Sequence, residues 1–378
     1  MGGDSGKKLA SYAMRVERTQ GRRYAEPAHP YRNDYERDRD RIIHSRAFRR
    51  LENKTQVFTR RLSDHFRNRL THTLEVAQIS RTVAGALGLN GDLVEALALV
   101  HDVGHPPFGH AGEEVLGRLM GGYGDTFDHN LHALRIVEKF EQKYAGFPGL
   151  NLTFEVREGI IKHSREYDAA KFPELAEYRL EEEPPLEAQL IDAADEIAYN
   201  SADLDDGYES KLLTLDAIRR GVPLFDRLVR PVERKYPRAI EKLKFNETLK
   251  RLIDTLVTDL IRTTQARLRD RRIRSVAEVR ALGRRVVQLG AARRRENREL
   301  KNFLFRKLYS HRALSAERDK IVRALEGLFR FFVEHPAKLP PAHFAKTGEE
   351  PVHRVVCDYI AGMTDPYLIE QHRKHLGS

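Results

Sequence analysis

The stretch DLVEALALVHDVGHPPFGHAGEE, residues 92–114, decides how the fold is predicted. Apolar residues at helical spacing in its first part predict a buried helix, with Asp92 as the expected N-cap. His101 and Asp102 follow in the last turn, and a glycine and two prolines then end the helix. A histidine and an aspartate at the end of a buried helix, with more imidazoles directly after them, indicate a metal site.

The composition indicates a soluble protein of a reducing compartment. The chain has 378 residues, of which 40% are hydrophobic, and this is enough for one large helical domain or two smaller ones. Cys357 is the single cysteine, which excludes internal disulfides and a cysteine-based zinc site. No stretch is as apolar as a membrane span, and the first residues lack the apolar run of a secretory signal, so we expect a cytoplasmic protein.

Positive charge is in excess, and it is concentrated in one stretch. The formal net charge is +10, which favours nucleotides, nucleic acid or acidic surfaces as partners. Arginines recur between residues 262 and 312. They fit either a solvated helix face or a surface for nucleic acid or an anionic effector.

Helical patterns extend over the rest of the chain, so we expect an all-α fold. Residues 1–20 are polar and are predicted to form a flexible N-terminal leader. A helical catalytic core is expected over residues 21–220. Residues 221–378 are expected to form a helical C-terminal region that packs on the core and completes the substrate site.

Two further helices supply candidate metal ligands. His72 lies in the first turn of a helix that Gly88 ends. Asp195 lies on a helix over residues 186–203 that is rich in small residues, and a carboxylate buried there needs a cation. Together with the first pair, these residues form a set of two imidazoles and two carboxylates: His72, His101, Asp102 and Asp195. Such a set suits Mn, Fe or Zn, and Mg with added waters.

Open positions on such an ion would accept a water and a phosphate oxygen, so hydrolysis of a phosphate ester is the expected chemistry. His110 and Glu113 lie three residues apart at the start of a helix, where the carboxylate can orient the imidazole and raise its basicity. His105 and His129 are further candidates for proton transfer or phosphate contact. The sequence contains no P-loop, and nothing in it resembles a nucleophilic serine or cysteine triad.

The order of these residues resembles a known family. It matches the H...HD...D signature of the HD-domain phosphohydrolases, and longer strings resemble the bacterial dGTP triphosphohydrolases over nearly the whole chain. These strings are RDRIIHSRAFRRL (39–51), RLTHTLEVAQ (69–78), HDVGHPPFGH (101–110), DEIAY (195–199) and DYIAGMTD (358–365). The resemblance implies a helical HD-domain core and hydrolysis of a deoxynucleoside triphosphate to the deoxynucleoside and inorganic triphosphate. It assigns the four ligands above to a divalent metal (Mn, Mg or Fe, with Zn as an alternative) and names His110 with Glu113 as the catalytic pair.

Similarity to the vertebrate dNTPase with the same domain implies the nucleotide contacts. It assigns Gln56 and Asp203 to the sugar hydroxyl, Tyr199 and Tyr309 to the sugar ring, and Arg69 and Lys301 to phosphate. The vertebrate enzyme has Lys and Arg where this chain has Glu196 and Lys301, so its phosphate clamp does not transfer intact. Glu196 would repel a triphosphate if it pointed inward.

Other partners and activities stay open at this point. Members of the family form homo-oligomers, so a hexamer or tetramer is expected, and some are activated by a nucleotide at an oligomer interface. A different nucleotide substrate, such as a deoxynucleoside monophosphate or a signalling nucleotide, is the first alternative. Binding of single-stranded DNA by the arginine-rich stretch is the second. The base preference cannot be predicted from a short motif.

Overall fold

The structure is a computed structural model that describes residues 9–56 and 66–377, with the side chains of 312–317 left aside. Every regular element in these ranges is a helix, and only three isolated β-bridges accompany them. The all-α prediction is therefore confirmed. No helix in these ranges has both the length and the apolarity that a membrane crossing requires.

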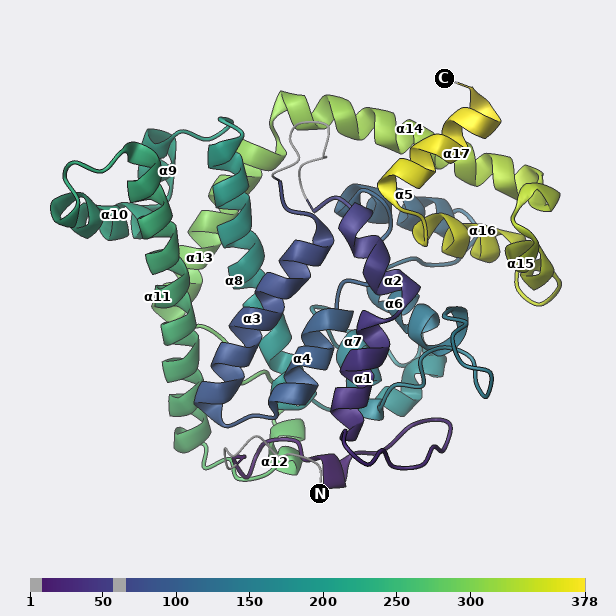
Figure 1. The fold of residues 1–378 in the computed structure, drawn as a ribbon, viewed down its shortest axis with the longest axis horizontal. Coiled ribbons are helices and arrows are strands. Elements are labelled where there is room, and N and C mark those ends of the chain that lie inside the picture. Colours follow the sequence, from purple (N-terminus) through teal and green to yellow (C-terminus); the bar gives the residue numbers. More distant parts are fainter. Residues whose placement is uncertain (1–8, 57–65, 378) are drawn as a thin grey trace.

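Three helices form the centre of the molecule and pack on one another: α3 (Arg69–Leu87), α4 (Gly91–Val100) and α8 (Leu186–Glu209). Helix α1 (Asp34–Ile43) covers α4, and the long α11 (Glu241–Asp270) lies against α3 and α8 (Figure 1). Because α3, α4 and α8 contact each other, residues far apart in the sequence meet where these helices cross.

Further helices surround this centre. Those before residue 240 are α2 (Arg46–Arg50), α5 (Gly109–Gly121), α6 (His129–Arg135), the π-helix η3 (Ile136–Phe140), α7 (Phe154–Ile161), α9 (Leu215–Gly221) and α10 (Pro223–Lys235). Those after it are α12 (Val276–Arg280), α13 (Ala291–Leu304), α14 (Arg312–Glu334), α15 (Pro341–Phe344), α16 (Val352–Ala361) and α17 (Asp365–Leu376).

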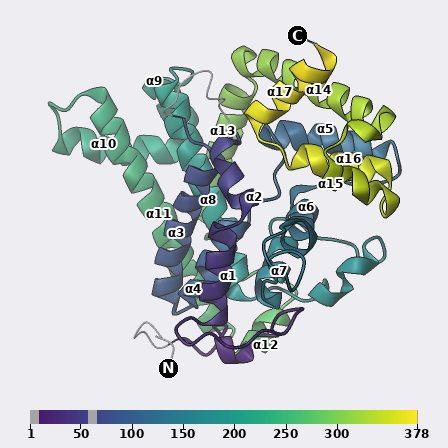
Figure 2. The ribbon, with the colours of Figure 1, turned by 45° about the vertical axis from the view of Figure 1, so that its right-hand side comes forward.

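The buried side chains form two hydrophobic cores. The larger core runs from Ala13 to Leu308 and joins the central helices to α9, α10, α11 and α13. The smaller core joins α5 to α14, α16 and α17, which stand together on one side of the molecule (Figure 2). Residues 115–127 belong to the smaller core although they lie within the sequence span of the larger one, so the two cores interleave along the chain. The division into a catalytic core over residues 21–220 and a C-terminal region over residues 221–378 stays a prediction.

The start of α4 differs from the prediction. Its N-cap is Asn90, whose side chain accepts hydrogen bonds from the backbone N–H groups of Asp92 and Leu93, both at 3.1 Å. Asp92 therefore lies inside the first turn, where its negative charge interacts favourably with the positive end of the helix dipole. The prediction that Gly88 ends α3 is correct, since Gly88 adopts the left-handed conformation at φ 68°.

The prediction of a flexible leader over residues 1–20 is wrong for residues 9–20, and residues 1–8 lie outside the described part. Ala13 and Met14 are buried in the larger core. The Met14 N–H donates to Glu187 Oε1 at 2.9 Å, and the Tyr12 hydroxyl donates to the Leu87 carbonyl at 3.0 Å. These partners lie on distant helices, so the local polar composition gave no sign of them.

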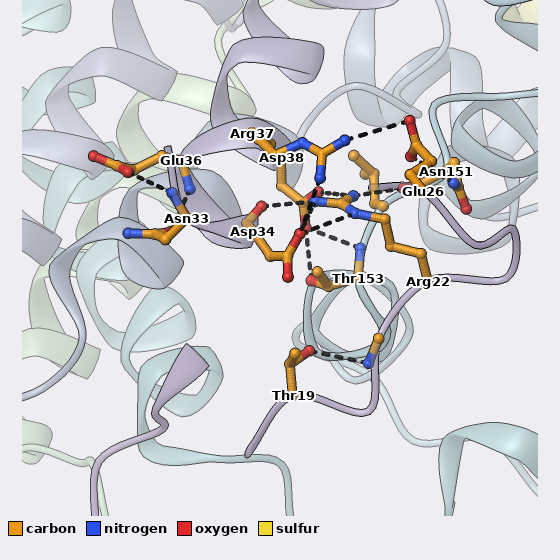
Figure 3. Close-up of polar contacts among 12 residues, drawn as sticks. Thr19, Arg22, Glu26, Asn33, Asp34, Glu36, Arg37, Asp38, Asn151 and Thr153 are labelled. Carbon is orange, nitrogen blue, oxygen red and sulfur yellow. Dashed lines mark hydrogen bonds and ion pairs between the residues drawn. The ribbon is translucent and has the colours of Figure 1, made fainter. Parts of the chain in front are cut away.

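A buried arginine ties the segment after residue 20 to α1. The Arg22 guanidinium pairs with Asp38, which is 0% exposed, and also with Asp34 at 3.2 Å (Figure 3). Asp38 Oδ2 in turn accepts hydrogen bonds from the N–H and the hydroxyl of Thr153 at 2.9 and 2.6 Å. One carboxylate therefore holds three separate chain segments together.

We expect Asp38→Ala to lower the free energy of unfolding by about 3 kcal/mol, because it removes the fully buried carboxylate that pairs with Arg22 and accepts from Thr153. Asp34→Ala is the matched control, since Asp34 lies on the same helix and contacts the same arginine but its side chain is 35% exposed. That variant should lose less than about 1 kcal/mol. Urea denaturation followed by circular dichroism measures both, and equal losses would contradict the assignment.

Candidate metal centre

The four predicted metal ligands meet where the central helices cross. Asn68 caps α3 and places His72 in its first turn. His101 and Asp102 follow the last residue of α4, and Asp195 lies in the first half of α8. The two histidines and Asp102 are at most 4% exposed, and Asp195 lies at the edge of the buried region.

The distances between these side chains suit a single ion. His72 Nε2 lies 2.9 Å from Asp195 Oδ1, and His101 Nε2 lies 3.8 Å from the same oxygen and 3.5 Å from Asp102 Oδ1. One ligand atom from each of His72, His101 and Asp102 lies within 4.8 Å of the others. Ligands of one transition-metal ion have this separation, because each lies about 2 Å from the ion.

The hydrogen bonds of His101 leave the correct nitrogen free. Its Nδ1 lies 2.7 Å from the Ala98 carbonyl, which only accepts, so Nδ1 carries the proton. Its Nε2 is then an unprotonated acceptor, and it is buried with no hydrogen-bond partner among the described residues. A buried lone pair without a donor is costly unless a cation takes it, so this donor set fits a metal ion.

The two carboxylates are held in their ionised form. Burial opposes ionisation of Asp195, but the hydrogen bond from His72 and the charges of the neighbouring imidazoles outweigh it and keep its pKa below the usual range. Burial likewise opposes ionisation of Asp102, and the Arg69 guanidinium at 2.8 Å outweighs it and keeps that pKa well below the usual range. Burial lowers the pKa of His101, so this imidazole stays neutral and able to bind a cation.

The buried Arg69 guanidinium lies close against the backbone of Gly109. It is among the largest fully buried side chains, and a Cβ added at Gly109 would lie 2.6 Å from its Nη2. Gly109 also has φ 57°, a left-handed value that favours glycine. Arg69 Nη1 donates to Asp102, so the guanidinium lies directly beside the metal ligands. Arg69 is also the residue that the sequence comparison predicts to contact phosphate.

The predicted proton-transfer groups lie in a second cluster beside the first. His105 Nδ1 lies 3.0 Å from Asp102 Oδ1, and the His105 ring stacks on His129 with centroids 4.0 Å apart. Glu113 lies 2.9 Å from His129 Nδ1 through Oε1 and 3.7 Å from His110 Nδ1 through Oε2. Burial opposes ionisation of Glu113, but its contacts with His110 and His129 outweigh burial and lower its pKa.

The two imidazoles that share Glu113 differ in exposure. The His110 side chain is 84% exposed, whereas that of His129 is 13% exposed. His129 also donates its backbone N–H to the same carboxylate oxygen at 3.2 Å. Glu113 therefore holds His129 firmly and holds His110 loosely at the opening of the site.

One histidine of the metal centre was not among the sequence-based predictions. His163 follows α7, and one ligand atom from each of His163, His101 and Asp195 lies within 4.8 Å of the others, which makes a second set of possible metal ligands. Asp192 anchors this histidine, with Oδ1 2.6 Å from His163 Nδ1. The sequence feature that could have pointed to this histidine was its partner Asp192. Asp192 precedes Asp195 by three residues and so lies on the same face of α8.

Two of the predicted nucleotide contacts, Tyr199 and Asp203, lie on α8 beyond Asp195, and Lys301 and Tyr309 contact them. The Tyr309 hydroxyl donates to Asp203, and Lys301 lies 5.4 Å from the centre of the Tyr199 ring. Burial raises the pKa of Asp203 to about 7. Gln56 Oε1 is buried and has no hydrogen-bond partner among the described residues, which leaves it open to a donor such as a sugar hydroxyl.

The repulsion predicted between Glu196 and a triphosphate is smaller than the sequence suggests. Glu196 Oε1 lies 3.9 Å from Lys301 Nζ, so the carboxylate faces the cation that is assigned to phosphate. The pair lies at the surface, where an ion pair holds both side chains only weakly.

Several arginines of the basic stretch have structural roles inside the molecule. Arg267 donates to the carbonyls of Val286, Gln288 and Leu289. Arg280 pairs with the buried Glu158 at 2.6 Å, and Arg285 pairs with Asp192 beside the metal centre. Binding of single-stranded DNA by this stretch stays a prediction, with fewer free arginines to support it.

Comparison with known proteins agrees with this site. The HD domain family model matches residues 69–200, which contain all four candidate ligands, and the phosphohydrolase-associated domain model matches residues 287–374. The chain is thus an HD-domain phosphohydrolase with a helical cluster able to hold a metal ion.

Individual relatives define the family of the chain more narrowly. It is 47% identical over 367 residues to a deoxyguanosinetriphosphate triphosphohydrolase-like protein of Ralstonia pickettii, covering 97% of this chain and 94% of that protein. It is 46% identical to proteins of the same description from Bordetella parapertussis, over 371 residues, and Geobacter metallireducens, over 366 residues, each covering 97% of this chain. The alignment covers 96% of the Bordetella protein and 94% of the Geobacter protein. The chain belongs to this family of dGTPase-like proteins, as the sequence strings predicted.

We expect His101→Ala to weaken Mn²⁺ binding by more than about 100-fold, because even the loss of a partner outside the ligand set costs 10- to 100-fold. His110→Ala is the control, since His110 lies outside the ligand set and should leave Mn²⁺ binding unchanged. Electron paramagnetic resonance of free Mn²⁺ measures both. Equal affinity of His101→Ala and the unmodified protein would rule out this centre.

Proposed function

We propose that the chain hydrolyses deoxynucleoside triphosphates to the deoxynucleoside and inorganic triphosphate. The observation that carries this proposal is the alignment of two subsites on one helix. Asp195 belongs to the candidate metal centre, and Asp203, eight residues further along α8, receives the Tyr309 hydroxyl. Eight residues of helix span about 12 Å, which is the scale of a nucleoside. A phosphate at the first subsite and a sugar at the second therefore fit a nucleotide.

The bond change that fits this arrangement is attack of water on the α-phosphorus. The water oxygen forms a bond to phosphorus while the bond from phosphorus to the sugar O5′ breaks. A divalent cation at the centre, with Mn, Mg or Fe as the proposed metals and Zn as an alternative, would supply Lewis-acid polarisation of the phosphoryl group. His72, His101, Asp102 and Asp195 would hold this charge in a largely buried setting, where its effect on phosphate is stronger than in water.

The protein's own groups then serve the leaving oxygen and the phosphates. His110 donates a proton to O5′ as the bond breaks, and it recovers a proton from solvent because its side chain is exposed. Glu113 Oε2, 3.7 Å from Nδ1 of this imidazole, orients it. Arg69, fixed by Asp102, offers its remaining N–H groups to a phosphate oxygen. Gln56 and the Asp203–Tyr309 pair contact the sugar.

The products test this reaction. Purified protein is incubated with each dNTP in turn, and with mixtures, in Mn²⁺ or Mg²⁺ and ¹⁸O-labelled water. We expect a deoxynucleoside without label and inorganic triphosphate with one labelled oxygen, since water attacks phosphorus and not the sugar carbon. His101→Ala should abolish turnover. Activity only in mixtures would identify a nucleotide that activates the protein.

Other outcomes would contradict this reaction. Release of a monophosphate and pyrophosphate would show cleavage of a different bond. Turnover of a deoxynucleoside monophosphate or a signalling nucleotide, with dNTPs left intact, would establish the alternative HD phosphohydrolase activity.

The role of His110 can be separated from that of the metal ligands. We expect His110→Ala to lower kcat by about 10²- to 10⁴-fold, the usual contribution of a general acid. The KM should change little, because His110 lies outside the phosphate and sugar contacts. Glu113→Gln should lower kcat less if the imidazole stays in place. A fall in kcat for His110→Ala together with lost Mn²⁺ binding would show that the residue supports the metal centre instead.

A further inference from the structure

A short segment with an unusual conformation joins the metal ligands to the proton-transfer groups. It runs from His105 to Phe108, between Asp102 and the start of α5. Phe108 has φ 60°, a left-handed value that is unfavourable for a residue with a β-carbon. Phe108 is also the N-cap residue of α5, and an apolar side chain cannot cap a helix. The start of α5 therefore needs support from outside this segment.

The proposed general acid stands directly after this segment. His110 is the second residue of α5, and its ring meets that of His105 edge to face, with centroids 5.7 Å apart. The His110 side chain is 84% exposed, and the Glu113 carboxylate, 3.7 Å from it, belongs to the same helix. Contacts of the ring therefore determine its place only weakly, and the backbone of residues 105–109 has to do so.

Lys54 holds the first residue of the segment. Its side chain is buried, and Nζ donates to the His105 carbonyl and, at 3.2 Å, to the Ala361 carbonyl. The Lys54 carbonyl in turn accepts the backbone N–H of Arg69 at 3.1 Å. One buried residue thus contacts the turn after α4, the end of α16 and the start of α3.

The Lys54 amine can hold both carbonyls whether or not it is charged. Burial and the charges of Arg50 and Arg69 lower the pKa of Lys54 to about 7. The neutral amine still has two N–H donors, one for each carbonyl. A buried amine costs free energy unless its donors are paired, and an apolar side chain would fill the same space without that cost. The two carbonyl contacts are therefore what this side chain contributes.

Asp365 holds the last residue of the segment. Its Oδ1 accepts the Phe108 N–H at 2.9 Å, and its Oδ2 accepts the Thr55 N–H at 2.8 Å. Asp365 is buried at the first position of α17. The carboxylate thus supports the left-handed Phe108 and also binds the residue that follows Lys54. Residues 105–108 are therefore held at both ends, by two side chains that are linked to each other through Thr55.

This support comes in part from the C-terminal helices. Ala361 is the last residue of α16, and Asp365 is the first of α17. Helix α16 packs on α5, and both belong to the smaller core (Figure 2). The turn between α16 and α17 therefore fixes the start of α5 relative to the turn that follows Asp102.

We propose that Lys54 and Asp365 are positioning residues for the hydrolysis. They act through the backbone of residues 105–108, and together they set the distance from His110 to the leaving oxygen at the metal centre. This inference rests on the proposed function, and it adds a role for the C-terminal helices in that reaction. A general acid works only within hydrogen-bond reach of its oxygen, and a displacement of about 1 Å can cost about 100-fold in rate.

The kinetic test compares Lys54→Met and Asp365→Ala with the unmodified chain. Methionine fills the buried space of the lysine but donates no hydrogen bond. We expect each variant to lower kcat for dNTP hydrolysis by at least about tenfold, with KM and Mn²⁺ affinity changed by less than about twofold. Lys143→Met is the matched control and should keep the kcat of the unmodified chain. Lys143 Nζ also donates to a carbonyl, that of His44 at 2.8 Å, but at the surface.

The double variant shows whether the two residues act on the same segment. Lys54→Met combined with Asp365→Ala should lose little more kcat than the weaker of the two single variants, because either loss already frees residues 105–108. Losses that multiply would overturn the pairing of the two residues.

A readout without turnover separates this inference from the reaction itself. The full chain labelled with ¹³C-histidine gives imidazole NMR signals, and the signal of His110 is assigned by its loss in His110→Ala. We expect this signal to move in Lys54→Met and in Asp365→Ala, while the signal of His29, which lies before α1, stays in place.

Thermal melts show whether each variant is folded, and Asp365→Ala decides alone if Lys54→Met does not fold. An unmoved His110 signal together with unchanged kcat in the folded variants would overturn the proposal. If the unmodified chain hydrolyses no dNTP, the proposed function fails, and the His110 signal still decides whether these residues position that imidazole.

Discussion

The placement of Asp102 and Asp195 as ionised groups in a buried setting constrains the rest of the site. A buried carboxylate is costly unless positive charge and hydrogen bonds compensate it. Arg69 binds one oxygen of Asp102, and His72 binds Asp195. His101 Nε2, between the two carboxylates, stays without a donor in the described chain. A cation bound there would complete the set, and its binding would stabilise the packing of α3, α4 and α8.

Close backbone contacts bring the proton-transfer groups to this centre. A Cβ added at Gly104 would lie 1.9 Å from the His129 carbonyl, so the turn after α4 touches the start of α6 with no room for a side chain. That contact stacks His129 on His105, and Glu113 from α5 then binds His129. The imidazole–carboxylate cluster is therefore a consequence of glycine placement as much as of the histidines themselves.

Residues with distinctive chemistry were the predictable part. His72, His101, Asp102 and Asp195 were identified because a buried imidazole or carboxylate needs a partner, and the structure brings them together. The packing of residues 9–20 was not predictable, because Tyr12 and Met14 bind residues 75 and 173 positions away. His163 was missed for the same reason. Its partner Asp192 belongs to another helix, and neither residue alone distinguishes a metal-site histidine from a core histidine.

The net charge of +10 illustrates how composition misleads about partners when burial is unknown. Arg267, Arg280 and Arg285 belong to the most basic stretch, yet they bind carbonyls and carboxylates of the same chain. Arg267 joins α11 to the loop after α12, Arg280 joins α12 to α7, and Arg285 joins that loop to α8, so these arginines act as structural links. Positive charge therefore indicates a ligand only where it is both gathered and left without a partner.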